Sequence, residues 1–396
     1  MSAESRILKN LDLDGAVELC AELVRIPSPI GQEKAAALFI ADKLRSIGVD
    51  EVDLIEGEPD RPNVLGRVKG KSEHPGLMFY GHIDSEHVLD GWTVEPYAGL
   101  IKDGKVYGRA SKDMRAGIAA FVKVTEAIIK SGLKPNSDLT LAFCVDEETA
   151  GDKGIGHLVE LGLINSAYGL YGETYEFGEI MVADSGTIWF ELTTHGVGQH
   201  TQLDSHKRHG INAVEKMARA ITELQKLDLA YEEHPLFKGM RPCIYCGTSI
   251  ESRVGMHPCM IPERCKATFD VRLVPGQDAD EVLKRIIGIL DGLKAEDPEF
   301  KYDINILKKR EPTQVPLDHP FLVAAQECIK EVSGKDAVLR GHEMTSDQAY
   351  IRSAGVVSVH LGPGNLLAHK PDEYIDIWQI KQAAQIYAKM AARFLF

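Results

Sequence analysis

Residues 139–148 read Leu-Thr-Leu-Ala-Phe-Cys-Val-Asp-Glu-Glu, an apolar run that ends in three adjacent carboxylates. The run Leu139–Val145 predicts a buried strand, because a short continuous apolar segment suits a strand that is covered on both faces. A buried strand that ends in acidic side chains places negative charge beside a cleft, and that charge needs compensation. A bound metal ion would supply it.

The neighbouring segments predict an α/β domain around this strand. The apolar run 77–80, closed by Gly81, predicts a second buried strand, and the patterns at 33–47 and 114–130 predict helices. Strands that alternate with helices favour a mostly parallel sheet with helices on both faces. Ligands of such sheets bind beyond the carboxyl ends of the strands.

A different order of expected strands and helices begins near Gly186, and it predicts a small α+β domain with the order β-α-β-β-α-β. The expected strands and helices are 187–194, 212–224, 241–250, 265–273, 280–293 and 302–308. After Pro320 the α/β pattern returns. We therefore expect a discontinuous catalytic domain, residues 1–185 and 310–396, interrupted by a second domain at 186–309.

Composition narrows the class of protein. The chain has 396 residues, with 45 Lys and Arg against 59 Asp and Glu, a net charge of -14 that disfavours nucleic acid as a partner. No apolar run approaches the ~18 residues of a membrane span, and the polar start has no signal-peptide pattern. Seven cysteines, an odd number, favour free thiols in a reducing compartment. We expect a cytoplasmic enzyme that acts on a small molecule.

Several short segments place metal-ligating side chains at the ends of the expected strands. Together they offer two imidazoles and several carboxylates, a mixture that suits zinc, cobalt or manganese. Each segment alone is a weak signal, since a single histidine or a Glu-Glu pair is more often an ordinary surface feature. The segments are 80–84 with His82 and Asp84, 108–114 with Asp113, 146–151 with Glu147 and Glu148, 172–174 with Glu173, and 368–373 with His369.

The order and spacing of these segments resemble the di-zinc family of acetylornithine deacetylase, succinyl-diaminopimelate desuccinylase, aminoacylase and glutamate carboxypeptidase. The resemblance extends from Arg25-Ile26-Pro27-Ser28 to the C-terminal helix, and it includes 210–213, 269–272 and 345–347. It implies a zinc-peptidase-like catalytic domain with a lid or dimerisation domain. It also implies a hydrolase that cleaves the amide bond of a small N-acyl amino acid or a dipeptide-like molecule.

The resemblance assigns roles in a centre of two divalent ions, zinc first, with cobalt and manganese left open. Asp113 resembles the carboxylate that bridges both ions and is followed by a cis peptide bond. Glu147 resembles the general base, and Asp84 the acceptor that orients His82, because both side chains point the same way on an extended chain. The remaining expected ligands are His82 and Glu173 on one ion, with Glu148 and His369 on the other.

The resemblance also points to residues that contact the substrate, which we expect to bear a carboxylate. His200 matches a histidine that stabilises the oxyanion in relatives, often from the partner subunit of a homodimer joined through the lid. Arg272 matches an arginine that binds a substrate carboxylate. The loop with Gly362 and Gly364 is expected to present backbone N–H groups to such a carboxylate.

Two departures from the family pattern leave other functions open. Cys259 stands where relatives often carry Asn, and the stretch 202–209 is richer in histidine and basic residues than usual. Both changes concern substrate recognition, so an aminohydrolase or a carbamoyl hydrolase is an alternative. A non-catalytic metal-binding scaffold is a more distant one, and a redox protein built on Cys243 and Cys246 is a third.

Overall fold

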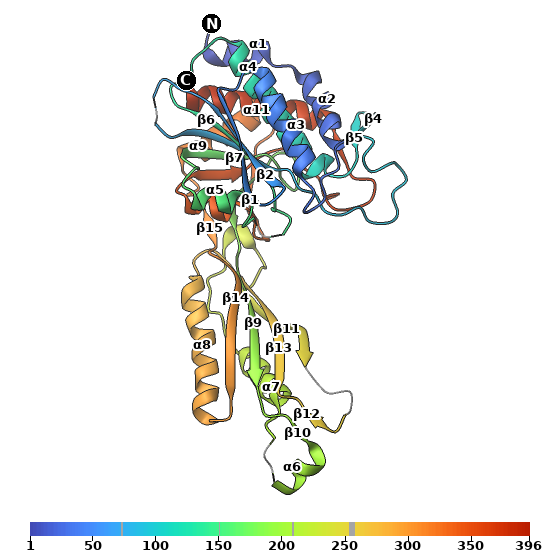
Figure 1. Ribbon diagram of the computed structural model, residues 1–396. Helices are drawn as coiled ribbons and strands as arrows, with labels where there is room; N and C mark the ends of the chain where they lie inside the picture. The colour runs from blue at the N-terminus through green and yellow to red at the C-terminus, as the bar shows by residue number, and fades with distance from the viewer. Residues whose placement is uncertain (73, 150, 208–209, 253–257) are drawn as a thin grey trace. The chain divides into compact units, whose positions relative to one another are not determined.

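The computed structural model describes residues 1–72, 74–149, 151–207, 210–252 and 258–396 (Figure 1). The chain divides into two compact units. The first comprises Met1–Val182, Val315–Arg340 and Ser346–Phe396, and the second comprises Ala183–Gln314 and Gly341–Thr345. None of the helices in the described parts of the chain combines the length and the apolar character that a bilayer crossing requires.

The first unit is built on a mixed β-sheet. Seven of its strands follow the order β1-β2-β6-β3-β7-β17-β8, and two short strands, β15 and β16, also belong to the sheet. At the centre β6, β3, β7 and β17 run parallel, whereas β2, β1 and β8 pair antiparallel with their neighbours. The predicted α/β class is confirmed, with the parallel part limited to the centre of the sheet. The strand bounds are β1(Glu51–Glu58), β2(Arg61–Val68), β3(Gly76–His82), β6(Leu139–Cys144), β7(Ser166–Tyr171), β8(Glu179–Asp184) and β17(Val357–His360).

Helices cover both faces of this sheet, so the central strand β3 is buried on both sides. This burial accounts for its apolar run. Phe79 stacks on Phe121 of α4 with ring centroids 4.4 Å apart, and Phe121 stacks on Tyr387 of α11 at 4.3 Å. Its neighbour Tyr80 points to the opposite face, into a cluster that includes Ile155 of α5 and Ile351 of α10. These helices span α4(Ala116–Lys130), α5(Ile155–Glu160), α10(Gln348–Ser353) and α11(Ile377–Leu395).

The other elements of the first unit complete this layer structure. Helix α3(Lys34–Ile47) ends at Gly48, whose φ of 91° is left-handed, which matches the end predicted from the sequence. A small sheet is ordered β18-β5-β4. The bounds are α1(Ala3–Asn10), α2(Leu13–Val24), β4(Leu100–Lys102), β5(Lys105–Tyr107), η1(Ser111–Arg115), α9(Pro320–Ser333), β16(Val338–His342) and β18(Tyr374–Asp376).

The second unit contains the predicted β-α-β-β-α-β order as β9, α7, β11, β13, α8 and β14. Its four-stranded sheet is ordered β11-β13-β9-β14, and all neighbours are antiparallel. Alternate residues of β13 are buried, because α7 and α8 pack on one face of the sheet. The bounds are β9(Gly186–His195), α7(Ala213–Leu224), β11(Cys243–Ser252), β13(Arg264–Leu273), α8(Ala279–Glu296) and β14(Lys301–Arg310).

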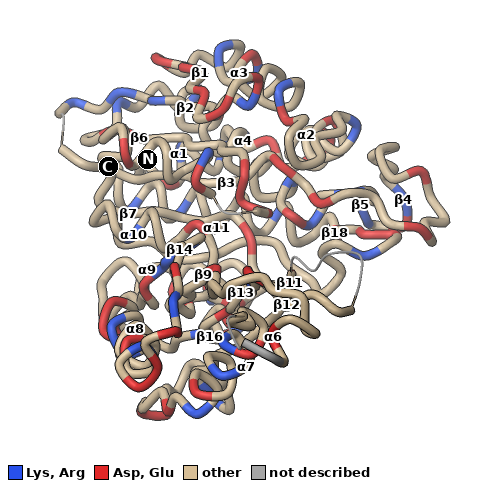
Figure 2. Tube along the Cα trace, turned by 60° about the horizontal axis from the view of Figure 1, so that its bottom comes forward, with Lys and Arg blue, Asp and Glu red and all other residues tan. Residues whose placement is uncertain are grey.

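Smaller elements of the second unit are β10(Gln199–His200), α6(Thr201–Lys207), η2(Pro235–Phe237), β12(Met260–Ile261) and β15(Thr313–Gln314). Acidic and basic residues follow one another closely along α8 (Figure 2), and most of them are exposed. Its buried side, by contrast, contributes Val282, Ile286 and Leu290 to the core of the unit. This amphipathic pattern is the one that predicts the helix from the sequence.

Candidate metal centre

The carboxyl ends of the parallel strands bring the predicted segments together. His82 is the last residue of β3 and is aligned with Cys144, the last residue of β6. Tyr171 ends β7, which lies on the other side of β3. Because parallel strands end at the same edge of a sheet, His82, the acidic pair after β6 and Glu173 after β7 all emerge at one edge.

Asp113 lies at the centre of the cluster. It belongs to η1, and the peptide bond between Asp113 and Met114 is cis. One carboxylate oxygen lies 2.9 Å from His82 Nε2, and the other lies 3.1 Å from His369 Nε2. His369 Nε2 is also 3.1 Å from a carboxylate oxygen of Glu148. A single aspartate therefore connects two imidazoles that are far apart in the sequence.

Asp84 contacts both His82 and the loop that follows β6. Its Oδ1 lies 3.4 Å from His82 Nδ1, and its Oδ2 accepts a hydrogen bond of 3.0 Å from the backbone N–H of Glu148. Both His82 and Asp84 are fully buried. Asp84 thus fixes the imidazole on one side and the acidic loop after β6 on the other.

The same loop is anchored by a buried charge cluster around Arg61. The Arg61 guanidinium binds both carboxylate oxygens of Glu33, at 2.7 and 3.1 Å, and lies 3.2 Å from Asp146 Oδ1. Asp146 has a left-handed φ of 75°, and its carboxylate also accepts hydrogen bonds from Thr149 Oγ1 and the N–H of Lys153. These contacts determine where the chain delivers the next two residues, Glu147 and Glu148.

Glu147 accepts a hydrogen bond from a residue to which the sequence pattern assigned no role. The Tyr171 hydroxyl donates a hydrogen bond of 3.0 Å to Glu147 Oε1. Burial raises the pKa of Glu147 well above its ordinary value, although His82 opposes the shift. A carboxylate whose proton affinity is raised in this way is suited to accept a proton during a reaction.

Lys112 is a second partner without a role assigned from the sequence. Its Nζ lies 2.9 Å from Glu173 Oε2 and 4.0 Å from Asp113 Oδ2. Burial works against its charge, but Asp113 and Glu173 outweigh that effect and raise the pKa of Lys112. The available signal was its place directly before Asp113 in the segment 108–114.

Glu373 holds the loop that carries Asp113. It is fully buried, and its two carboxylate oxygens accept hydrogen bonds from the backbone N–H groups of Ala110, Lys112 and Asp113, at 3.0 to 3.3 Å. Arg109 Nη1 is its charged partner at 2.9 Å. Glu373 is the last residue of the predicted segment 368–373, but the sequence gave no indication of this contact, because the Asp113 loop lies far away along the chain.

The donor set fits divalent metal ions. Ligand atoms of His82, Asp113 and Glu148 all lie within 4.8 Å of one another. Glu148 Oε1 is buried and has no hydrogen-bond partner within the described part of the chain. Burial raises the pKa of both Glu148 and Glu173. His369 opposes this shift for Glu148 and Lys112 opposes it for Glu173, but the pKa of each stays raised, so the protein alone compensates their ionised forms only in part. Imidazole and carboxylate ligands with such a deficit of positive charge suit zinc, cobalt or manganese.

The substrate residues expected in the second unit lie on its strands. His200 of β10 pairs with Met260 of β12, directly after Cys259, so His200 and Cys259 are near neighbours. Arg272 of β13 is bound through its guanidinium to Asp270, at 3.0 Å. In the basic stretch that follows His200, Arg208 and His209 lie outside the described residues.

Gly362 and Gly364 are placed in the first unit, against the strand end that carries Glu173. A side chain at Gly362 would meet the backbone of Gly172 at 2.4 Å, and one at Gly364 would meet the Thr174 carbonyl at 2.2 Å. The Gly364 N–H is donated to Gln379 at 2.8 Å. Close packing of two backbones therefore requires glycine at both positions.

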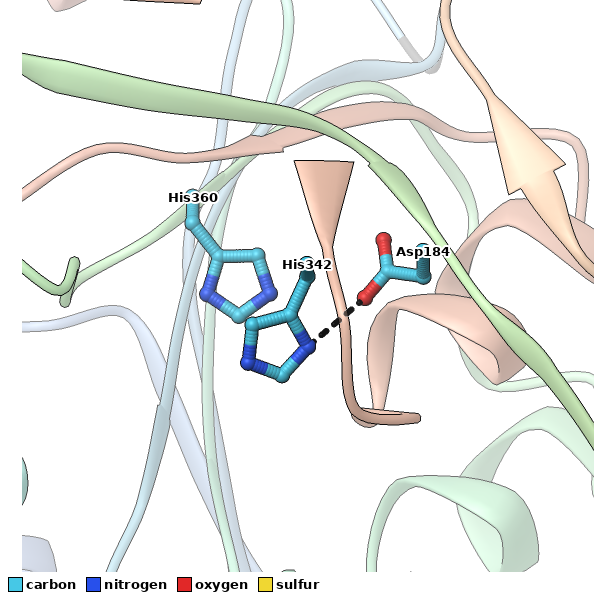
Figure 3. A group of neighbouring side chains, drawn as sticks. All are labelled: Asp184, His342 and His360. Carbon is cyan, nitrogen blue, oxygen red and sulfur yellow. Dashed lines mark ion pairs between the residues drawn. The ribbon is translucent and has the colours of Figure 1, made fainter. Parts of the chain in front are cut away.

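Another histidine and carboxylate pair lies in the second unit. His342 Nδ1 is 3.4 Å from Asp184 Oδ1 and 2.7 Å from the Met344 carbonyl oxygen (Figure 3). His360, labelled in the same figure, belongs to the first unit, where its ring stacks on Tyr171 with centroids 4.0 Å apart. Each of these histidines has a contact within its own unit.

Comparison with known proteins agrees with this site. The model of peptidase family M20/M25/M40 matches residues 78–393. The succinyl-diaminopimelate desuccinylase of Marinobacter nauticus is 28% identical over 397 residues, which cover 97% of this chain and 100% of that protein.

Solved structures share the fold at lower identity. A tripeptidase from Staphylococcus aureus is 19% identical with a TM-score of 0.75, over 97% of this chain and 100% of that one. A dinuclear metal-binding M20 peptidase from Bacillus subtilis is 15% identical with a TM-score of 0.70, over 96% and 98%.

The fold and the cluster of imidazoles and carboxylates define a metal-dependent hydrolase of amide and peptide bonds. The chain belongs to peptidase family M20/M25/M40.

Proposed function

We propose that the protein is a zinc-dependent hydrolase that cleaves the amide bond of a small N-acyl amino acid or a dipeptide-like molecule. The arrangement of Asp113, with its two oxygens 2.9 Å from His82 and 3.1 Å from His369, carries this proposal. A carboxylate between two imidazoles is suited to bridge two divalent ions. The desuccinylase relative supports an N-acyl substrate and favours amide hydrolysis over the aminohydrolase and carbamoyl hydrolase alternatives.

The ligands divide into two sets that share Asp113. We assign His82 and Glu173 to one ion, and Glu148 and His369 to the other. Such ions, when bound, lower the pKa of a water molecule and polarise the substrate carbonyl. Asp84 keeps the His82 ring in the orientation that its contact with Asp113 requires.

Glu147 is assigned as the general base. It accepts the proton of the attacking water and transfers that proton to the departing nitrogen. The Tyr171 hydroxyl holds Oε1 of Glu147, so we assign the proton transfer to the other oxygen. Glu148 has the separate task of a ligand, which accounts for two adjacent carboxylates after β6.

The domain that we expect at 186–309, which lies within the second unit, acts as a lid and joins two chains into a homodimer. His200 stabilises the oxyanion, and Arg272, oriented by Asp270, binds the carboxylate of the substrate. Cys259 and Gly362 complete our assignment of substrate contacts. We leave the N–H of Gly364 out, because it is donated to Gln379. All seven cysteines are free, which supports a reducing, cytoplasmic location.

The test is a substrate screen with protein loaded with Zn²⁺, Co²⁺ or Mn²⁺. N-Succinyl and N-acetyl amino acids and dipeptides are supplied, and the released amine is measured. We expect turnover of at least one class, loss of turnover after chelation, and recovery on adding metal. Absence of turnover by protein that holds two ions would count against amide hydrolysis of these compounds.

Glu147→Gln is the matched variant. It keeps the shape of the side chain and should retain the metal content, while kcat falls by ~100-fold or more, the scale of a lost proton-transfer group. Substantial turnover by this variant would refute the assignment of Glu147.

Light scattering of the full-length protein tests the dimer.

A further inference from the structure

Lys112 places a fixed positive charge among the side chains that we assign as metal ligands. Its side chain is only 6% exposed, and its Nζ lies 2.9 Å from Glu173 Oε2 and 4.0 Å from Asp113 Oδ2. Its backbone N–H is donated to Glu373 Oε1 at 3.0 Å, so the main chain of this residue is held as well. The ammonium group is therefore buried in the cluster and held there by defined contacts.

This charge lies closest to the position of His82 and Glu173, because its distance of 2.9 Å from Glu173 is shorter than its 4.0 Å from Asp113 Oδ2, the oxygen that faces His369. Glu173 has Lys112 as an ion-pair partner, whereas Glu148 pairs with His369 among the described residues and with no lysine or arginine there. An ammonium group has no lone pair, so it cannot bind a metal ion. It competes for the carboxylate oxygen and repels a divalent cation nearby, an effect that is strong where water is largely excluded.

We propose that Lys112 makes the two metal positions unequal: its ammonium group competes directly with the ion at His82 and Glu173, whereas at the position of Glu148 and His369 it acts only from the longer distance to Asp113 Oδ2. This proposal rests on the ligand assignment of the proposed function. The protein then holds one ion tightly, and the second position is filled according to the metal supply. Lys112 acts on metal occupancy and is not itself a ligand.

Metal binding by the full-length protein tests this directly. Metal-free protein is titrated with Co²⁺, followed by calorimetry and by the visible absorption of the bound ion. The wild-type protein should bind one ion tightly and a second at least about tenfold more weakly. Lys112→Met should strengthen the weaker position by at least about tenfold and leave the tighter one within about threefold.

Two variants serve as controls. Lys112→Arg keeps the charge and should retain unequal binding. Lys123→Met removes another partly buried lysine of the same unit, one that pairs with Asp12 and Glu126, and should bind as the wild type does. Circular dichroism checks folding, and Lys112→Gln replaces Lys112→Met in the titration if the latter does not fold.

The outcomes separate the two proposals. If wild-type protein binds two ions with equal affinity, or if removing the charge leaves the weaker constant unchanged, the role of Lys112 is refuted and the metal-dependent function stands. If wild-type protein binds no ion at all, the proposed function fails. Unequal binding that becomes nearly equal in Lys112→Met supports both.

Discussion

Replacing Arg61 tests how far a buried charge cluster stabilises the first unit. Arg61 is 10% exposed through its side chain, and its principal partner, Glu33, is fully buried. In Arg61→Met the Glu33 carboxylate loses the cation that binds both of its oxygens, and Asp146 loses the same partner. Removing one member of a buried ion pair typically costs about 3–5 kcal/mol, because the other charge stays buried without compensation.

Urea unfolding of the metal-free proteins, followed by circular dichroism, measures this loss. A reduction of about 3–5 kcal/mol is large, since the free energy of unfolding of a typical domain is about 5–15 kcal/mol. The control is Arg45→Met. Arg45 forms a pair with Asp42 in which the side chains are 48% and 78% exposed, and such surface pairs contribute about 0–1 kcal/mol.

A double variant separates the buried charge from the lost packing. Arg61→Met combined with Glu33→Met removes both members of the principal pair, so no carboxylate is left alone at Glu33. We expect it to be more stable than Arg61→Met alone, because the unpaired charge is the main penalty. Equal losses for Arg61→Met and Arg45→Met, or a double variant that loses the sum of its single losses, would refute this reasoning.

Three other results are expected. Tyr171→Phe removes the hydroxyl that holds Glu147 and should lower kcat by about tenfold with little change in KM. The reason is that a hydrogen bond to a charged group contributes ~1.5–3 kcal/mol. Unchanged kinetics would exclude this positioning role. Arg272→Ala should mainly raise KM for substrates with a carboxylate, and an unchanged KM would remove it from the binding site. Burial raises the pKa of Cys20 and Cys328 to about 12, so at pH 8 both are protonated thiols. Iodoacetamide should therefore label them only after unfolding. Rapid labelling of both in the native protein, detected by mass spectrometry, would contradict this.

Local sequence pattern was sufficient to predict much of the fold. The helix predicted at 33–47 is α3(Lys34–Ile47), and the strand predicted at 139–145 is β6(Leu139–Cys144). Both carry their signal locally, in a periodic or continuous apolar run that is closed by a glycine or by charged residues. The antiparallel strands β1 and β2 were not predicted. The edge strand β1 is half exposed and rich in acidic residues, and the buried strand β2 is interrupted by polar residues such as Asn63 and Arg67, so neither contains a continuous apolar run.

The site shows the same limit. The order of His82, Asp113, Glu147, Glu148, Glu173 and His369 could be recognised from short segments. The contacts of Lys112 with Glu173, Tyr171 with Glu147 and Glu373 with the Asp113 loop could not, since each joins residues of segments that are distant in the sequence. Which side chain completes a contact of this kind is decided by the packing of the sheet and its helices.

The distribution of the assigned ligands along the chain has a consequence for biosynthesis. His82 and Asp113 are synthesised well before His369, Glu373 and the α11 residue Tyr387, which packs beside Phe121 in the core. A nascent chain therefore lacks both an assigned ligand and the contact of Glu373 with the Asp113 loop until these later residues have been made. We therefore expect a chain cut before His369 to lack a complete metal site.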